Sequence, residues 1–224
     1  MVLNKPPGLP VQGGEGVTVS LDSLLAETCA VRPFLVHRLD RDTSGLILVA
    51  KDREAAAGFS ALFGSRRAGN GTPQDREKGV IKQYQAVCSG LPSPAQGLIR
   101  LSLDVRGREL ESETFYTLLS SWNAGGRDFS HLDLELGTGR MHQIRRHLAR
   151  IGCPVLGDDK YGDFRLNKTL RKTLGLKRLL LHASRLFLPP FPPLVPEGLD
   201  ISAPLPDYFE SFLVHTLGPG PRSD

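Results

Sequence analysis

Charged side chains that could perform chemistry crowd into one short stretch, His37–Gly45 (His-Arg-Leu-Asp-Arg-Asp-Thr-Ser-Gly). It holds two carboxylates, Asp40 and Asp42, and two arginine guanidinium groups. Residues 46–50 follow at once, and their short aliphatic run predicts a buried strand. Charges beside a core need partners or a function. We therefore expect a loop that enters a core strand, and its carboxylates have either partners or a function.

Two interpretations of this stretch involve metal ions. Asp40, Asp42 and Ser44 have the spacing of the first ligands of a calcium loop. That motif needs a bidentate glutamate where this sequence has Lys51, so we exclude a calcium loop. A phosphatase of the haloacid dehalogenase type would use a D-x-D aspartate as nucleophile and bind Mg²⁺ with later acids such as those at 158–159. There the apolar strand precedes the first aspartate, whereas here it follows. The phosphatase stays a minor alternative.

The two carboxylates of the loop carry different expectations. For Asp42 we expect a structural role, either paired with Arg38 or Arg41 or exposed to solvent. For Asp40 the structural interpretation is the same, namely capping of the loop and pairing with a neighbouring arginine. Whether Asp40 has this structural role or a functional one depends on residues elsewhere in the chain.

A second candidate group lies on a helix predicted from about Arg140 to Ile151. Arg145 falls on the shoulder of its apolar stripe, roughly 70° from the centre at about 100° per residue. A guanidinium there is partly buried and cannot lose its proton, so it needs a carboxylate partner. By contrast, Arg146 and Arg150 point away from the stripe. The stripe has spacings of three, four and three and consists of Met141, Ile144, Leu148 and Ile151.

The surrounding pattern predicts several hairpin-like strands with a few helices between them, which favours an α+β fold with a mainly antiparallel or mixed sheet. We expect one domain over residues 1–215 and a disordered tail over 216–224. Residues 64–80 predict a long Gly-rich loop. The predicted helices are Leu21–Thr28 with Ser20 as N-cap, Asp52–Phe63 capped by Asp52, and Asp207–Val214. The predicted strands are Val2–Leu3, Ile81–Cys88, Ile99–Val105, Glu113–Leu119, His131–Leu136 and Leu179 toward Leu188, with an extended segment over Pro189–Pro196.

The composition limits the classes of protein to which the chain can belong. The chain has 224 residues and a net charge of +4, which alone is weak support for a polyanionic partner. The three cysteines, Cys29, Cys88 and Cys153, form no C-x-x-C motif, so we expect reduced thiols and no zinc site. No apolar run approaches the roughly 18 residues of a membrane span, and we expect no secretion signal. We expect a cytoplasmic monomer without cofactor or metal, in which His37 and His182 are structural.

Basic residues gather in two segments that contain no acid. Thr138–Arg150 holds four arginines, and Arg165–Arg178 holds six lysines and arginines. A charge run is often only a solvated surface. Two acid-free segments near a candidate site nevertheless favour the phosphate backbone of a nucleic acid as ligand.

These residues resemble the RluA family of pseudouridine synthases, and the resemblance spans residues 3 to 183. Its most specific part is His37-Arg38-Leu39-Asp40 with Thr43-Ser44-Gly45, followed later by Gly139-Arg140-Met141-His142-Gln143-Ile144-Arg145 with His147. The other matching blocks are Leu3–Val11, Lys82-Gln83-Tyr84 with Ala86, Pro154–Asp158 with Tyr161-Gly162, and Leu181-His182-Ala183.

The resemblance implies an enzyme that isomerises uridine of ribosomal or transfer RNA to pseudouridine after flipping the base. It implies that Asp40 is the catalytic carboxylate, that Tyr84 stacks on the target base, and that Arg145 pairs with Asp40. Asp40 either attacks C1′ or removes a proton from C2′, and both routes stay open. The residues expected to contact RNA are Lys5, Arg38, Arg140, His142, Gln143, Arg146 and Lys160.

The resemblance also has departures. The family's first strand would begin several residues before Leu3, so the chain resembles a domain trimmed at its start, and we expect no RNA-binding domain of the S4 type before the catalytic part. The alternative function is a non-catalytic RNA-binding or ribosome-assembly protein on the same fold. The presence of Asp40, Tyr84 and Arg145 together argues against this alternative.

Overall fold

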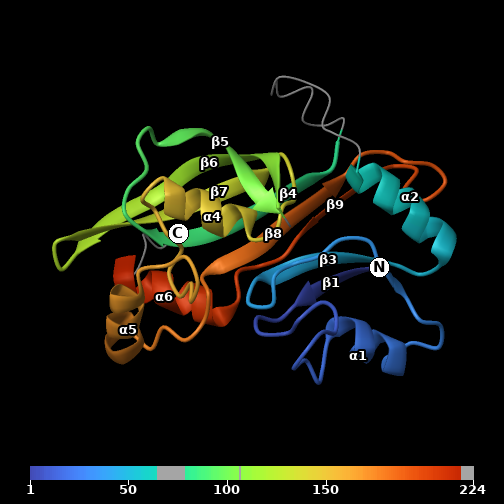
Figure 1. Ribbon diagram of the computed structural model, residues 1–224, viewed down its shortest axis with the longest axis horizontal. Helices are drawn as coiled ribbons and strands as arrows, with labels where there is room; N and C mark the ends of the chain where they lie inside the picture. Colours follow the sequence, from blue (N-terminus) through green and yellow to red (C-terminus); the bar gives the residue numbers. More distant parts are fainter. Residues whose placement is uncertain (65–78, 106, 218–224) are drawn as a thin grey trace, which may run out of the picture. The chain divides into compact units, whose positions relative to one another are not determined.

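The chain folds into two compact units of α+β structure, shown in Figure 1. The computed structural model describes residues 1–64, 79–105 and 107–217. The first unit comprises Met1–Gln83 with Ala183–Ala203, and the second comprises Tyr84–His182 with the chain from Pro204 onward. Two strands, β4 (Ile81–Ser89) and β8 (Leu181–Leu188), each contain residues of both units. The expected fold class is confirmed, while a single domain over 1–215 stays a prediction.

The first unit is built around β3 (Ser44–Ala50), in which every residue is buried. β3 lies between β1 (Val2–Lys5) and β8, with antiparallel pairing to β1 that sets Lys5 opposite Gly45. Two short strands extend this arrangement: β2 (Phe34–Leu35) pairs with β3, and β9 (Leu199–Ser202) pairs with β8. The aliphatic run that follows the charged loop is therefore a core strand, as predicted.

Two helices complete the first unit. α1 (Leu21–Thr28) has the predicted bounds and begins with a capping box between Ser20 and Ser23. α2 (Arg53–Gly64) begins after Asp52, whose Oδ1 accepts a 2.7 Å hydrogen bond from the N–H of Ala55. Its Phe59 is buried in a core formed with β3 and β8.

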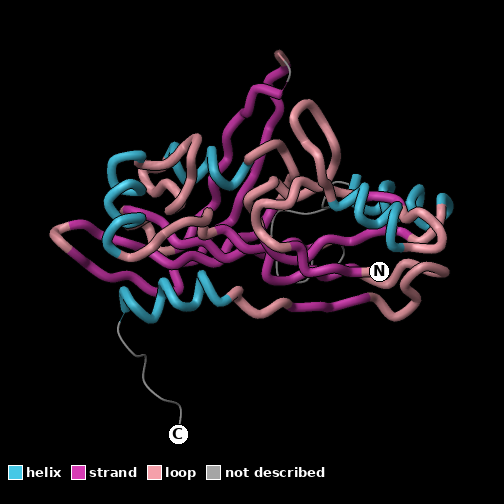
Figure 2. Tube along the Cα trace, turned by 90° about the horizontal axis from the view of Figure 1, so that it is seen from below, coloured by secondary structure: helices cyan, strands magenta, loops and turns pink. Residues whose placement is uncertain are grey.

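The second unit contains long antiparallel hairpins. Its strands lie in the order β4, β7 (Arg127–Leu136), β6 (Arg108–Ala124) and β5 (Gln96–Val105). Figure 2 shows the strands of the chain in magenta. The helices are α4 (Gln143–Arg150), α5 (Phe164–Thr173) and α6 (Asp207–Leu217). Leu166 and Leu170 of α5 and Phe209 of α6 share one core with Val87 and Phe129.

The helix predicted over Arg140–Ile151 is shorter than expected. It begins at Gln143, because His142 before it adopts a left-handed conformation with φ of 53°. Met141 therefore lies outside the helix and is 58% exposed, and Ile151 ends the helix and is 38% exposed. These two residues do not belong to the core stripe, whereas Ile144 and Leu148 do.

Other expectations meet mixed outcomes. Residues 189–196 are not extended: Phe191 and Val195 form an isolated bridge that closes a turn. The sequence also did not predict β2, β9 or α5. Most of the expected loop (65–78) and of the expected tail (218–224) lies outside the described residues. None of the described helices is long and apolar enough to cross a membrane.

Candidate active site

Asp40 lies in the loop that joins β2 to β3, between the buried Leu39 and the buried Thr43. The side chain of Asp40 is half-buried, and its backbone carbonyl accepts a hydrogen bond from the N–H of Thr43 at 3.2 Å. This hydrogen bond closes a tight turn immediately after the carboxylate. The loop thus presents Asp40 from a fixed backbone at the start of a core strand.

Lys5 holds this loop from the neighbouring strand β1. Its ammonium donates 2.9 Å hydrogen bonds to the backbone carbonyls of Pro6, Leu9 and Arg41, which use all three of its N–H groups. The side chain is only 1% exposed. Burial lowers the pKa of Lys5 to about 8, while the nearby carboxylates Asp42 and Asp40 act in the opposite direction.

This geometry assigns Lys5 a role that differs from the expected RNA contact. Its ammonium is enclosed and engaged by the protein, so it stabilises the loop and lies close enough to Asp40 for the two charges to interact. A buried ammonium near a carboxylate favours the ionised form of that carboxylate. Lys5 is therefore part of the support of Asp40.

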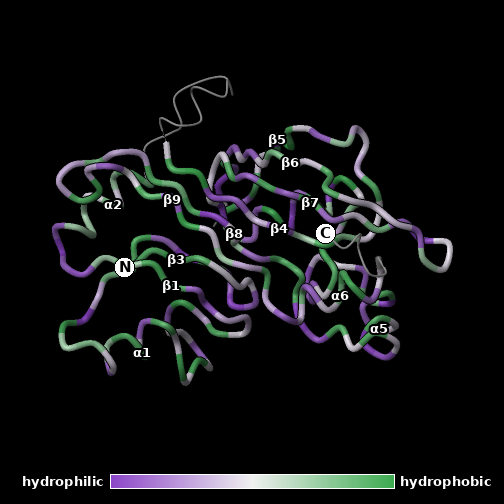
Figure 3. Tube along the Cα trace, turned by 180° about the vertical axis from the view of Figure 1, so that it is seen from behind, coloured by the Kyte–Doolittle hydropathy of each residue, from purple (hydrophilic) through white to green (hydrophobic). Residues whose placement is uncertain are grey.

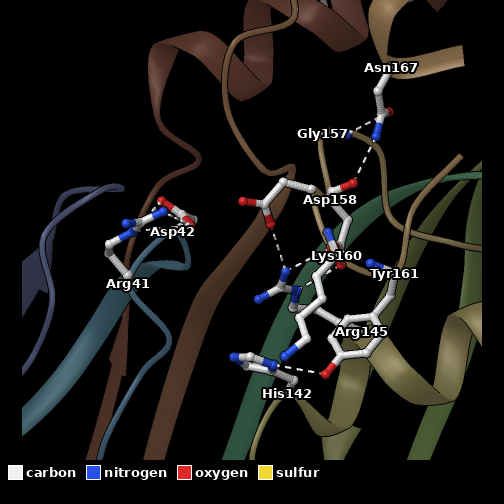
Figure 4. A network of polar contacts seen from close by, with 10 residues as sticks. Arg41, Asp42, His142, Arg145, Gly157, Asp158, Lys160, Tyr161 and Asn167 are labelled. Carbon is white, nitrogen blue, oxygen red and sulfur yellow. Dashed lines mark hydrogen bonds and ion pairs between the residues drawn. The ribbon is translucent and has the colours of Figure 1, made fainter. Parts of the chain in front are cut away.

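Asp42 pairs with its neighbour Arg41, with 3.3 Å between Nη2 and Oδ2 (Figure 4). The Arg41 side chain is largely exposed to solvent. An exposed pair of this kind contributes little to stability. The expectation that Asp42 is a structural loop partner is confirmed. Arg38, expected to contact RNA, is exposed.

His37 is a structural histidine, as predicted. Its Nε2 accepts a 2.8 Å hydrogen bond from the N–H of Leu48, and its ring stacks on Phe63 with 4.7 Å between centroids. Burial, followed by the nearby charge of Lys82, lowers the pKa of His37 to about 3. The ring is therefore neutral at physiological pH and anchors the loop to β3.

Gly45 is required by close packing at the end of the same loop. Its φ is +108°, and a Cβ at this position would lie 2.2 Å from the carbonyl oxygen of Ala183 in β8. A side chain here would both strain the backbone and push β8 away. The glycine of the loop motif is explained by this contact.

In the second unit, Gln143 fixes the start of α4. Its Oε1 accepts hydrogen bonds from the Arg140 N–H at 3.0 Å and from Thr138 Oγ1 at 2.7 Å. Its Nε2 donates to the carbonyl of Glu113 at 2.8 Å and to Thr114 Oγ1 at 3.0 Å. The residue is 3% exposed. Gln143, expected to contact RNA, is thus a buried connection between α4 and β6.

Arg145 projects from α4 and is 4% exposed, so the expectation of burial is confirmed. Its Nε and Nη2 donate to the two carboxylate oxygens of Asp158, both at 2.7 Å (Figure 4). Nη2 also lies 3.2 Å from Oδ1 of the exposed Asp159. The guanidinium carbon is 5.3 Å from the centre of the Tyr161 ring. The carboxylate partner that the sequence required is therefore Asp158.

Asp158 is itself held in place by several donors. Its Oδ1 accepts hydrogen bonds from the N–H groups of Lys160 and Tyr161 at 2.8 and 2.9 Å. Burial raises the pKa of Asp158, but the hydrogen bonds from Arg145 and from these two N–H groups outweigh burial, so the pKa lies below its usual value. Asp158 is consequently an ionised, immobile partner for the guanidinium.

Asn167 of α5 supports the turn that carries Asp158. Its Oδ1 accepts from the N–H of Gly157 at 3.0 Å, and its Nδ2 donates to the Asp158 carbonyl at 2.9 Å (Figure 4). A Cβ on Gly157 would lie 2.1 Å from the Arg178 carbonyl, and one on Gly162 would lie 2.4 Å from the Asp158 carbonyl. Only glycine fits these positions. Sequence reasoning missed Asp158 and Asn167 as site residues.

Two other predicted residues of this unit lie beside Tyr161. Nδ1 of His142 is 3.1 Å from the Tyr161 hydroxyl, and the exposed Lys160 lies over the Tyr161 ring at 5.6 Å. Arg146 donates a 3.0 Å hydrogen bond to the carbonyl of Asp104. Tyr84 is 6% exposed.

The structure thus assembles the predicted residues in two sets. Lys5, Arg38 and Asp40 belong to the first unit, and the remaining seven belong to the second. The expected pairing of Asp40 with Arg145 would join the two units and stays a prediction.

Comparison with known proteins gives a consistent picture. Residues 1–150 match the family model described as RNA pseudouridylate synthase. A curated relative from Rickettsia typhi, "Ribosomal large subunit pseudouridine synthase C", is 34% identical over 93% of this chain and 66% of its own length. Its namesake from Vibrio parahaemolyticus is 33% identical over 96% of this chain and 65% of its own length. The chain therefore spans just under two thirds of these relatives.

Solved structures agree with the sequence matches. "Human RNA Pseudouridylate Synthase Domain Containing 4" superposes with a TM-score of 0.72 and 28% identity, covering 96% of this chain and 88% of that one. "Human RNA Pseudouridylate Synthase Domain Containing 1" gives a TM-score of 0.68 and 25% identity, covering 92% and 79%. The α+β fold of this chain is the fold of these proteins.

Proposed function

The chain belongs to the RNA pseudouridylate synthase family, and we propose that it isomerises uridines of ribosomal or transfer RNA to pseudouridine, with Asp40 as the catalytic carboxylate. The observation that carries this proposal is the way in which the protein holds Asp40. The side chain of Asp40 is half-buried, and the buried ammonium of Lys5 binds the turn in which it lies. The names of the bacterial relatives favour ribosomal RNA as the substrate class.

The reaction breaks the bond between uracil N1 and ribose C1′ and forms a bond between C5 and C1′. The hydrogen on C5 leaves as a proton and N1 gains one, so the product is an isomer and no oxidant or second substrate is consumed. An ionised carboxylate can attack C1′, as in a retaining glycosidase, or remove the C2′ proton. Both routes require Asp40 to be ionised, and the positive charge of Lys5 favours this state.

The proposed roles in the second unit follow from burial and charge. Tyr84, a buried aromatic residue, would stack on the flipped uracil. Arg145, fixed by Asp158, would present a guanidinium of defined orientation to the carboxylate of Asp40. Arg38, Arg140, His142, Arg146 and Lys160 would contact the RNA strand. We further propose that the protein acts as a monomer in the cytoplasm.

The test is tritium release from transcribed bacterial large-subunit ribosomal RNA that carries 5-tritiated uridine. We expect the wild-type chain to release tritium as C5 loses its hydrogen. A chain that binds this RNA and releases no tritium would instead be a non-catalytic RNA-binding protein. Release of inorganic phosphate that depends on Mg²⁺ would support the phosphatase alternative.

A further inference from the structure

We propose that α5 forms a docking surface for the sugar–phosphate backbone of RNA, on which Phe164 stacks against an unpaired base. This inference rests on the RNA substrate of the proposed function and adds a binding surface beyond the reacting groups. The α5 surface consists of Phe164, Arg165, Lys168, Arg171 and Lys172, all of which are exposed. The sequence did not predict α5 as a helix, so the arrangement of these residues comes from the structure.

The helix separates its apolar and cationic residues sharply. Leu166 and Leu170 are both 7% exposed and face the core of the second unit. At about 100° per residue, all five residues of the α5 surface fall within a sector of roughly 120°, centred opposite these two leucines. Figure 3 shows hydrophilic and hydrophobic residues side by side on α5. The cations are therefore directed together to solvent.

Helix stability alone does not account for these charges. Cations in the last turn, here Arg171 and Lys172, interact favourably with the helix dipole. Arg165 lies in the first turn, where a positive charge is unfavourable, and no acid is present in that turn. The stability of the helix therefore does not explain why Arg165 stands at this position.

The nearest acid does not neutralise the surface. Asp163 directly precedes α5, where its Oδ1 accepts a 2.9 Å hydrogen bond from the N–H of Leu166 as an N-cap. Its Oδ2 lies 3.4 Å from Nη1 of Arg127, which is an additional cation at this end of the helix. Beyond the helix, the exposed Lys177 and Arg178 extend the basic segment. This excess of positive charge fits a chain of phosphates.

Phe164 adds a feature that a merely solvated basic surface does not need. The side chain is at the first position of α5 and is 60% exposed. On the helical wheel it shares a narrow sector with Lys168 and Arg171. An exposed aromatic ring beside cations is the arrangement with which proteins hold single-stranded nucleic acid, because every base has a face on which to stack. The surface therefore fits RNA with unpaired bases.

The experiment measures the affinity of the full chain for a fluorescein-labelled RNA hairpin with an unpaired uridine-rich loop. In one variant Lys168, Arg171 and Lys172 are replaced by alanine, and in a second variant Phe164 is. We expect the dissociation constant of the triple variant to rise about tenfold or more at low salt, and the slope of log affinity against log salt to fall by roughly two. We expect Phe164→Ala to raise the dissociation constant roughly fivefold or more, and Phe164→Trp to retain the affinity of the wild type.

A matched control removes the same number of positive charges elsewhere. Lys51, Arg53 and Arg108 are exposed and lie outside the α5 surface. Replacing these three by alanine should leave the affinity and the salt slope close to those of the wild type. Equal effects of the two triple variants would mean that only net charge matters, and the proposal would be overturned.

The outcome also separates this proposal from the proposed function. With 5-tritiated uridine RNA, the α5 variants should raise KM and leave kcat at saturating RNA nearly unchanged, because α5 holds no reacting group. Normal RNA affinity in both α5 variants, together with tritium release by the wild type, would overturn the docking surface alone. If the wild-type chain neither binds the hairpin nor releases tritium, both proposals fall.

Discussion

Arg145 and Asp158 form a buried, bidentate ion pair with both N–O distances at 2.7 Å. The pair joins α4 to the turn that Asn167 of α5 also supports. Two parallel hydrogen bonds fix the plane of a guanidinium as well as its position. The guanidinium of Arg145, which we propose to pair with Asp40, is thus oriented by Asp158, thirteen positions later in the chain.

Replacing Asp158 by asparagine should release Arg145. The change leaves a buried guanidinium without its anion, which we expect to cost about 3 kcal/mol of stability and most of the turnover. Asp159→Asn is the matched control, because Asp159 also contacts Arg145 but its side chain is 71% exposed, so the loss should stay below roughly 0.5 kcal/mol. Chemical denaturation and tritium release measure both effects. Similar losses in the two variants would contradict the role of Asp158.

Lys5→Met should loosen the Asp40 loop. The substitution removes three hydrogen bonds to backbone carbonyls, so we expect a loss of roughly 1–3 kcal/mol and a lower kcat. Lys51→Met, at an exposed lysine, should have little effect. Unchanged stability and kcat in the Lys5 variant would show that the loop does not depend on this clamp.

Lys5 should also leave a signature in the pH dependence of stability. Its pKa is about 8 in the folded protein and near 10.5 when unfolded, so between these values the unfolded chain binds more protons. Its contribution to stability therefore rises with pH in this window. Denaturation at a series of pH values should show that the Lys5→Met variant lacks this rise. An identical profile in both proteins would contradict the assignment.

Gly45→Ala should be among the most damaging single substitutions in the first unit. The new Cβ would lie 2.2 Å from the Ala183 carbonyl, and the positive φ adds strain, so we expect a loss of at least about 2–3 kcal/mol. Gly13→Ala is the control, because a Cβ there meets nothing within 4 Å. Thermal unfolding compares the two. Equal melting temperatures would show that β8 moves away without cost.

Acid should destabilise the first unit through His37. Its pKa is about 3 when folded and near 6.5 when unfolded, so below pH 6.5 the unfolded chain takes up a proton that the folded chain does not. Stability should therefore fall as the pH decreases from about 6.5 toward 4. The His37→Asn variant should lose part of this dependence, and His215→Asn, at an exposed histidine, should keep it. Denaturation curves at several pH values across this range compare the two variants. An equal pH dependence of stability in both would contradict the role of His37.

The sequence was a good guide where local rules dominate. Ser20 and Asp52 cap the helices they were expected to cap, and residues 46–50 form the buried strand their aliphatic run predicted. The burial of Arg145 and its need for a carboxylate followed from the helical period alone. Such features depend on a few neighbouring residues and on spacing.

The sequence was a poor guide where contacts between distant segments decide. Gln143 and Lys5 read as polar residues available to RNA, yet backbone groups from other elements enclose both. The partnership of Asp158 depends on a glycine turn whose geometry no period reveals. α5 was missed because its apolar positions, Leu166 and Leu170, are too few among so many cations to form a recognisable stripe.

The central claim, that Asp40 performs the chemistry, is tested most directly by Asp40→Asn. This change removes the charge while keeping the size of the side chain. We expect tritium release from 5-tritiated uridine RNA to fall by at least about a thousandfold, while affinity for the RNA hairpin and thermal stability stay near those of the wild type. Turnover within a few-fold of the wild type would contradict the account and remove Asp40 from the reaction.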